Sequence, residues 1–83
     1  MTTIDELRSI LKETLQIGKR ADKLGEETVL FGGIPEFDSV AVVSVVTSIE
    51  DRFGIVIEDD EINAETFETL GSLRVFVDSK LAE

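Results

Sequence analysis

The tripeptide Asp38-Ser39-Val40 contains the side chain that is best placed to do chemistry in this sequence. It ends a segment with glycine and proline and opens a long apolar run, so Ser39 stands where a loop passes into a helix. A serine in this position is either a helix cap or a hydroxyl to which another group is attached. Taken alone, the dipeptide Asp38-Ser39 favours the cap, because both residue types are preferred there.

The rest of the composition argues against catalysis by the chain itself. Its 83 residues include no histidine and no cysteine, so there is no Ser-His or Cys-His dyad and no zinc site of the usual kind. Paired carboxylates can do acid–base chemistry, but they need a cleft, and so small a domain has little volume for one. We therefore expect a protein that is not an enzyme and that holds no metal ion.

The charge limits the class of partner. Eighteen acidic residues stand against eight basic ones, which gives a formal charge of −10. Nucleic acids and anionic membranes are themselves polyanions, so the balance favours partner proteins with basic surfaces instead. No segment resembles a signal peptide or reaches the length of a membrane span. We expect no nucleic acid partner, no membrane insertion, a cytoplasmic location and a monomer.

The two ends of the chain are predicted to be helical. Apolar residues recur with helical period from Ile4 to Leu15, Thr3 and Glu6 have the spacing of a capping box, and Gly18 is a plausible stop.

A last helix is predicted over residues 70–81, after an acidic cluster at residues 58–61 that predicts one short helix. Gly71 inside the last helix costs about 1 kcal/mol against alanine, so another interaction should hold the backbone there. Candidate caps for this helix are Thr66, Glu68 and Thr69.

The middle of the chain is harder to assign. Residues 18–38 show no clean period, yet they are too apolar for a solvated linker, so we predict a packed crossover that covers the bundle. Residues 40–53 are ambiguous, because five valines favour a strand while the apolar spacing is that of a helix face. The residues on that helix face are Val42, Val45, Val46, Ile49 and Phe53.

At this point the sequence resembles the acyl carrier proteins over nearly its whole length. The similarity rests on Asp38-Ser39 at a helix start, on Ile-Glu-Asp-Arg-Phe-Gly-Ile at residues 49–55 and on Phe-Glu-Thr-Leu-Gly-Ser-Leu at residues 67–73. The family's central motif is Asp-Ser-Leu, followed by a helix that ends in Leu/Ile-Glu-x-x-Phe. The resemblance implies one all-α domain over residues 1–83, a four-helix bundle with a long first loop and a short third helix. It also implies that residues 40–53 are helical.

The resemblance implies a function for Ser39 as well. A phosphopantetheinyl transferase would esterify its hydroxyl with 4′-phosphopantetheine from coenzyme A, and this arm would bring the thiol that holds acyl groups as thioesters. Asp38 would assist the modification through the transferase's magnesium. In this context the attachment interpretation of Ser39 outweighs the cap.

Two departures from the family pattern bear on the partners. Val40 replaces the usual leucine, and the helix that follows Ser39 has no acid before Glu50, where fatty-acid-type members carry acids soon after the motif. We therefore expect acyl-loading and acyl-transfer enzymes with basic docking surfaces to bind partly on apolar residues and partly on downstream acids. A dedicated polyketide, lipid or polysaccharide-linked pathway is favoured over general fatty-acid biosynthesis. The expected docking residues are Val40, Ala41, Glu50, Asp51, Glu58 and Asp59.

Two other functions stay open. A carrier of aminoacyl or D-alanyl groups would share the arm and the fold, and only its loading enzyme would differ. An unmodified acidic helical module that binds a basic partner would explain the charge, but it would leave the setting of Ser39 as a coincidence.

Overall fold

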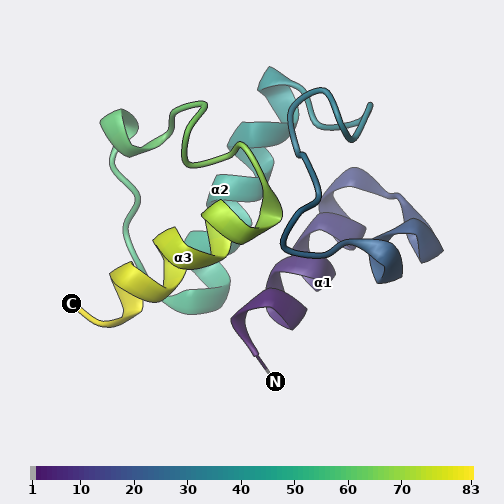
Figure 1. The fold of residues 1–83 in the computed structure, drawn as a ribbon. Coiled ribbons are helices and arrows are strands. Elements are labelled where there is room, and N and C mark those ends of the chain that lie inside the picture. Colours follow the sequence, from purple (N-terminus) through teal and green to yellow (C-terminus); the bar gives the residue numbers. More distant parts are fainter. Residues whose placement is uncertain (1) are drawn as a thin grey trace.

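The computed structural model describes residues 2–83, which fold into three α-helices and two short 3-10 helices. The second 3-10 helix is the short third helix of the predicted four-helix bundle, so the all-α fold is confirmed. Residues 2–83 contain no β-strand. The first α-helix packs against each of the other two, and Figure 1 shows how the three are arranged. In chain order the elements are α1 (Thr3–Leu15), η1 (Gly18–Lys23), α2 (Ser39–Phe53), η2 (Asp59–Glu61) and α3 (Leu70–Leu81).

One apolar core lies between the α-helices, and the long loop before α2 contributes to it. No polar or charged residue among residues 2–83 is buried as a whole. The largest fully buried side chains are Phe67, Leu7, Ile10, Leu11, Leu30, Ile49, Leu70, Leu73, Val45 and Val77. The core therefore joins all three α-helices to the two loops that connect them.

Helix α1 begins one residue earlier than the Thr3–Glu6 spacing indicated. The capping residue is Thr2, whose hydroxyl accepts a hydrogen bond from the Asp5 N–H at 3.3 Å, while the Asp5 carboxylate accepts one from the Thr2 N–H at 3.5 Å. The prediction of a Thr3–Glu6 box was wrong, because both residues have other partners. Thr3 donates to Asp78 of α3 at 2.5 Å, and Glu6 accepts from Arg52 of α2 at 2.6 Å.

Helix α2 forms despite its valine-rich sequence. Four of the five residues that the helical spacing selected are buried, with Val45 and Ile49 fully shielded from solvent, and Phe53 is half-buried. Burial of this face outweighs the modest cost of β-branched residues in a helix. The helix ends at Gly54, whose φ of 67° is a left-handed value that glycine adopts without strain.

The predicted packed crossover is confirmed, but it contains a helix that sequence analysis missed. Residues Gly18–Lys23 form η1, in which Ala21 is the buried residue. Beyond η1 the loop buries Leu30, Ile34 and Phe37. The segment is thus part of the core and not a solvated linker.

Residues 26–30 of this loop are bound to residues 68–71, and we refer to this contact as the strap. Figure 1 shows the loop passing beside the start of α3 at this point. The strap explains Gly71, because a Cβ atom there would lie 2.7 Å from the Glu26 carbonyl oxygen. Its three backbone hydrogen bonds, each 2.9 Å long, run from Leu30 to Glu68, from Leu70 to Thr28 and from Gly71 to Glu26.

Of the three candidate caps for α3, the structure selects Thr69. Its hydroxyl accepts a hydrogen bond from the Ser72 N–H at 3.0 Å, and the Ser72 hydroxyl is the acceptor for the Thr69 N–H at the same distance. Helix α3 also holds η2, because Lys80 pairs with Glu61 at 2.7 Å. The hydrogen bond from Lys80 holds the pKa of Glu61 below its ordinary value.

A tight turn at Gly33 provides a test of the loop's packing. A Cβ atom at Gly33 would lie 2.0 Å from the Val29 carbonyl oxygen, whereas one at Gly25 would meet nothing within 4 Å. We expect Gly33→Ala to lower the free energy of unfolding by about 1–3 kcal/mol, because the backbone must move to admit the methyl group. The matched control Gly25→Ala should change it by less than about 0.5 kcal/mol. Urea denaturation measures both, and equal effects would show that the turn is not tightly packed.

Candidate functional site

Asp38 and Ser39 divide two tasks at the start of α2. Asp38 has an extended backbone (φ −116°, ψ −175°), and its Oδ1 accepts a hydrogen bond from the Ala41 N–H at 2.8 Å. Asp38 is therefore the N-cap, and Ser39 is the first residue of the helix. The cap interpretation of Ser39 does not hold, because the neighbouring aspartate already performs that role.

The Ser39 side chain is free to react. Ser39 is exposed, and its hydroxyl makes no hydrogen bond to any other part of residues 2–83. The N–H groups of Ser39 and Val40 lie in the first turn, where a helix has no carbonyl partners for them and where its dipole is positive. This position favours a negatively charged substituent such as a phosphodiester, so the residues present fit a phosphate group attached at Ser39.

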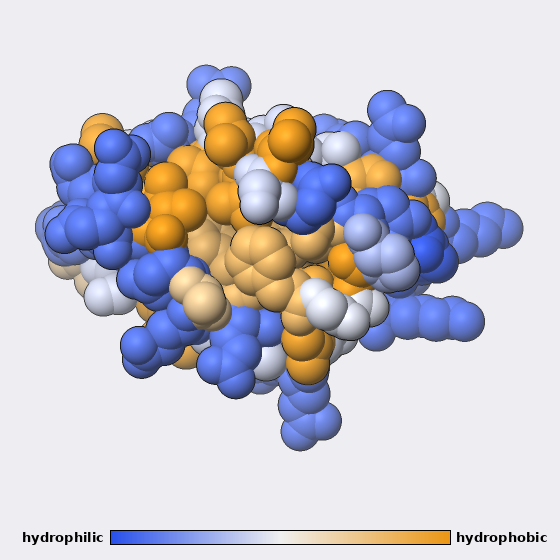
Figure 2. Space-filling view, turned by 90° about the horizontal axis from the view of Figure 1, so that it is seen from above, coloured by the Kyte–Doolittle hydropathy of each residue, from blue (hydrophilic) through white to orange (hydrophobic). Residues whose placement is uncertain are grey.

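Apolar side chains surround this position. Val40 is 76% exposed and Val43 is 66% exposed, both on the outer side of α2. Phe31, from the loop before α2, is also exposed. Figure 2 looks down on the end of the molecule where α2 begins, and it shows apolar side chains gathered near the middle of this face with hydrophilic ones around them. We call Phe31, Val40 and Val43 the apolar collar.

An apolar cavity of about 290 Å³ lies next to the first turn of α2. Val42 lines it, one helical turn after Ser39, and Phe31 and Phe67 contribute aromatic walls. The Phe37 ring stacks edge-on against Phe31 at a centroid distance of 4.8 Å and so braces that wall from the core side. Of the five phenylalanines of the chain, Phe31 and Phe67 are the two that line this cavity. The remaining lining residues are Ile62, Asn63 and Ala64.

The six expected docking residues do not form one patch. Val40 lies beside Ser39 and Ala41 is half-buried against the core, but Glu50 is eleven residues farther along α2, about 16 Å along its axis. Glu50 also has a structural role, because its Oε2 accepts the Ile57 N–H at 2.9 Å and so fixes the connector after α2. The other three expected residues, Asp51, Glu58 and Asp59, are exposed.

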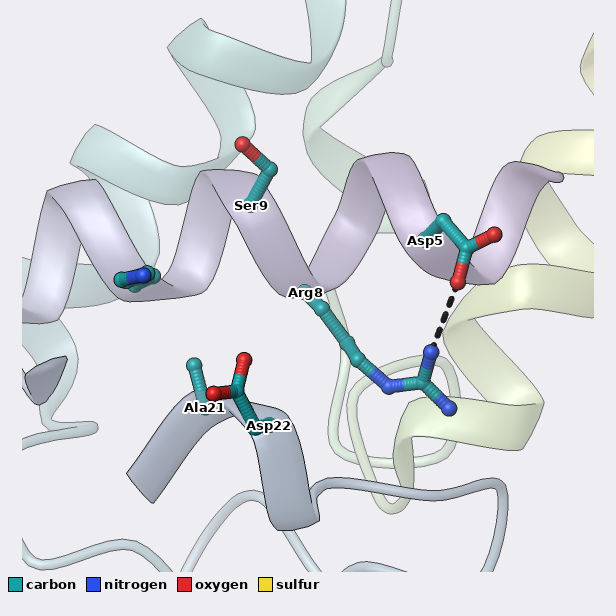
Figure 3. A pocket seen from close by; sticks show the side chains of 6 residues that line it. Asp5, Arg8, Ser9, Ala21 and Asp22 are labelled. Carbon is teal, nitrogen blue, oxygen red and sulfur yellow. Dashed lines mark hydrogen bonds and ion pairs between the residues drawn. The ribbon is translucent and has the colours of Figure 1, made fainter. Parts of the chain in front are cut away.

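A second, polar pocket of about 330 Å³ lies between α1 and η1 (Figure 3). Two of its charged groups pair with each other, because Arg8 donates to Asp5 at 2.7 Å, and Arg8 also donates to the Leu24 carbonyl at 2.6 Å. Hydrogen bonds from Thr2 lower the pKa of Asp5, so this carboxyl stays ionised at neutral pH. A general acid needs a raised pKa, so Asp5 is not poised for acid catalysis.

Residues 2–83 offer no group of three or more side chains that could bind a metal ion. None of the helices in this part of the chain is both long enough and apolar enough to cross a membrane.

Comparison with known proteins agrees with the geometry of this site. The family model of the phosphopantetheine attachment site matches residues 5–74. The solution NMR structure of a holo acyl carrier protein from Nitrosomonas europaea is 48% identical, with a TM-score of 0.92 and coverage of 100% of both chains. No curated protein matches this chain. The chain therefore belongs to the acyl carrier family of phosphopantetheine-binding proteins, which are not enzymes and which carry 4′-phosphopantetheine as a covalent group.

Proposed function

We propose that Ser39 is the residue that a phosphopantetheinyl transferase esterifies with 4′-phosphopantetheine. The observation that supports this most directly is the capping of α2 by Asp38, which leaves the exposed Ser39 hydroxyl without a hydrogen-bond partner in residues 2–83. When bound, the arm supplies a thiol that holds acyl groups as thioesters, a group that a chain without cysteine cannot supply itself.

Asp38 would contribute to the modification in two ways. Its Oδ1 holds the first turn of α2 through the Ala41 N–H and thereby fixes the backbone that carries Ser39. Its Oδ2 accepts no hydrogen bond from residues 2–83, so it remains available to the magnesium ion of the transferase. This oxygen lies on the residue next to the reacting hydroxyl.

The apolar cavity favours an acyl group over an aminoacyl or D-alanyl group as the cargo. Its walls are hydrocarbon except for Asn63, and it lies one turn from Ser39. Transfer of an alkyl chain from water into such a cavity is favourable, whereas transfer of an ammonium group is unfavourable because the group loses its hydration. We therefore propose that the cavity between α2 and the segment before α3 shelters part of an acyl chain.

The apolar collar and the acids at the start of η2 together favour a partner enzyme with an apolar patch and basic residues around it. Contact at Val40 and Val43 would select an enzyme with an apolar patch, and the exposed Glu58 and Asp59 would attract basic residues around it. Such a surface suits acyl-loading and acyl-transfer enzymes of a dedicated pathway, whether polyketide, lipid or polysaccharide-linked. It is less suited to general fatty-acid synthase enzymes, because the carriers that these enzymes bind have acidic residues soon after the serine.

Attachment at Ser39 is tested by mass spectrometry after incubation with coenzyme A, magnesium and a broad-specificity phosphopantetheinyl transferase. We expect the wild-type protein to gain the mass of one 4′-phosphopantetheine and Ser39→Ala to gain none. Ser44→Ala is the matched control, because Ser44 is an exposed serine of the same helix, and it should be modified like the wild type. An unmodified wild type, or a modified Ser39→Ala, would refute the assignment.

Shelter of the cargo is tested by filling the cavity. Loading the wild type with an octanoyl group should raise its melting temperature, because the chain is buried only in the folded state. Ala64→Leu occupies part of the cavity and should reduce this rise, whereas Ala82→Leu at the end of α3 lies outside the cavity and should preserve it. Equal rises in the two variants would show that the chain lies elsewhere.

The role of η2 in docking is tested by reversing one charge. We expect Asp59→Lys to lower kcat/KM of the transferase about threefold at low ionic strength, with the difference shrinking as salt screens the attraction. Asp22→Lys is the control, because Asp22 is also an exposed aspartate of a 3-10 helix but lies in η1. If Asp59→Lys has no more effect than Asp22→Lys at every salt concentration, η2 is not part of the docking surface.

A further inference from the structure

We propose that the ion pair between Arg20 of η1 and Glu36 of the long loop positions Ser39 for modification. This inference rests on the proposed role of Ser39. Arg20 would not touch the reacting atoms, and it is therefore a positioning residue that acts by holding the loop that leads into α2.

The contact joins two segments that are sixteen residues apart in sequence, where the Arg20 guanidinium donates to the Glu36 carboxylate. Among the described residues it is the only side-chain hydrogen bond or ion pair that ties residues 31–37 to another part of the chain. Apolar anchors flank it, because Ile34 and Phe37 on either side of Glu36 are both buried. The backbone from the strap to Ser39 is therefore held by two apolar side chains, the ion pair and the backbone hydrogen bonds that the Ile34 and Phe37 N–H groups donate to Leu30 and Ile34.

The two partners depend on the pair to different degrees. Glu36 Oε1 is shielded from solvent and has no hydrogen-bond donor among residues 2–83, so only Oε2 is satisfied, by Arg20. The hydrogen bond from Arg20 also lowers the pKa of Glu36, so the carboxyl is ionised at neutral pH. The Glu36 side chain as a whole is 37% exposed, and that of Arg20 is 56% exposed and contains no such shielded atom, so Arg20 can be hydrated without its partner.

This asymmetry predicts what each substitution does. Without Arg20, Oε2 of the ionised Glu36 loses its charged donor while Oε1 stays shielded, so a movement of the loop that brings water to both oxygens is favoured. Without the charge of Glu36, nothing forces the loop to move. The loss of Arg20 should therefore displace the loop more than the loss of the Glu36 charge.

The experiment measures transfer of 4′-phosphopantetheine to full-length variants at saturating coenzyme A and magnesium. Arg20→Gln should lower kcat/KM about three- to fivefold, mainly through a higher KM for the carrier, because fewer molecules hold Ser39 in place before binding. Glu36→Gln should have a smaller effect, the double variant should be no slower than Arg20→Gln, and Arg20→Lys should recover part of the loss. Lys19→Gln is the matched control, since Lys19 is the neighbouring exposed residue of η1 and makes no ion pair within residues 2–83.

Charge steering predicts a different order. If the transferase responded only to net charge, Arg20→Gln and Lys19→Gln would behave alike, and Glu36→Gln would be the slowest variant. That order would overturn the proposal, and so would an Arg20→Gln variant modified at least as fast as Lys19→Gln.

Hydrogen exchange gives a readout that does not depend on the transferase. The amides of Ile34 and Phe37, which bond to Leu30 and Ile34 at 3.1 and 2.9 Å, should exchange faster in Arg20→Gln while those of α1 are unchanged. Unchanged exchange at both amides would overturn the proposal. A wild type that gains no mass refutes the role of Ser39, whereas a modified wild type with Arg20→Gln equal to Lys19→Gln refutes only the role of Arg20.

Discussion

The strap between residues 26–30 and the start of α3 is the constraint on which the position of the site depends. Without it, about twenty residues would separate α1 from α2, and a free loop of that length samples many positions. The strap fixes the loop to α3, so only residues 31–38 remain between this contact and α2. Gly71 makes the approach possible, because a side chain there would collide with the Glu26 carbonyl.

The order of Asp38 and Ser39 matters as much as their identities. An N-cap side chain must accept a hydrogen bond from the first turn, and its loss costs about 1 kcal/mol. If one serine both capped the helix and carried the substituent, its esterification could break the capping hydrogen bond. Because Asp38 provides the cap through the Ala41 N–H, the Ser39 hydroxyl can be esterified while the helix start stays intact.

The sequence predicted the elements that apolar periodicity controls, and the prediction failed where a local pattern was ambiguous or absent and where a contact joins distant residues. The three α-helices follow from apolar spacing, although α2 needed the family resemblance to overrule its valines. The capping box of α1 was placed one residue late, because Thr2–Asp5 and Thr3–Glu6 have the same spacing. Helix η1 buries only Ala21, which leaves no apolar pattern to detect. The hydrogen bond from the Ile57 N–H to Glu50 and the Arg20–Glu36 pair follow no local rule.

On the proposed docking surface, charge and apolar contact would serve different stages of recognition. A net charge of −10 attracts a basic partner over distances beyond contact, and this attraction does not require an acid next to Ser39. Discrimination between partners is decided at contact, where Val40 and Val43 offer only shape and apolar area. A partner that relied on acids in the first turns of α2 would find no counter-charge there and would leave its own basic groups unpaired. If partners dock as proposed, a start of α2 without acids would select among basic partners that the charge of the whole protein attracts alike.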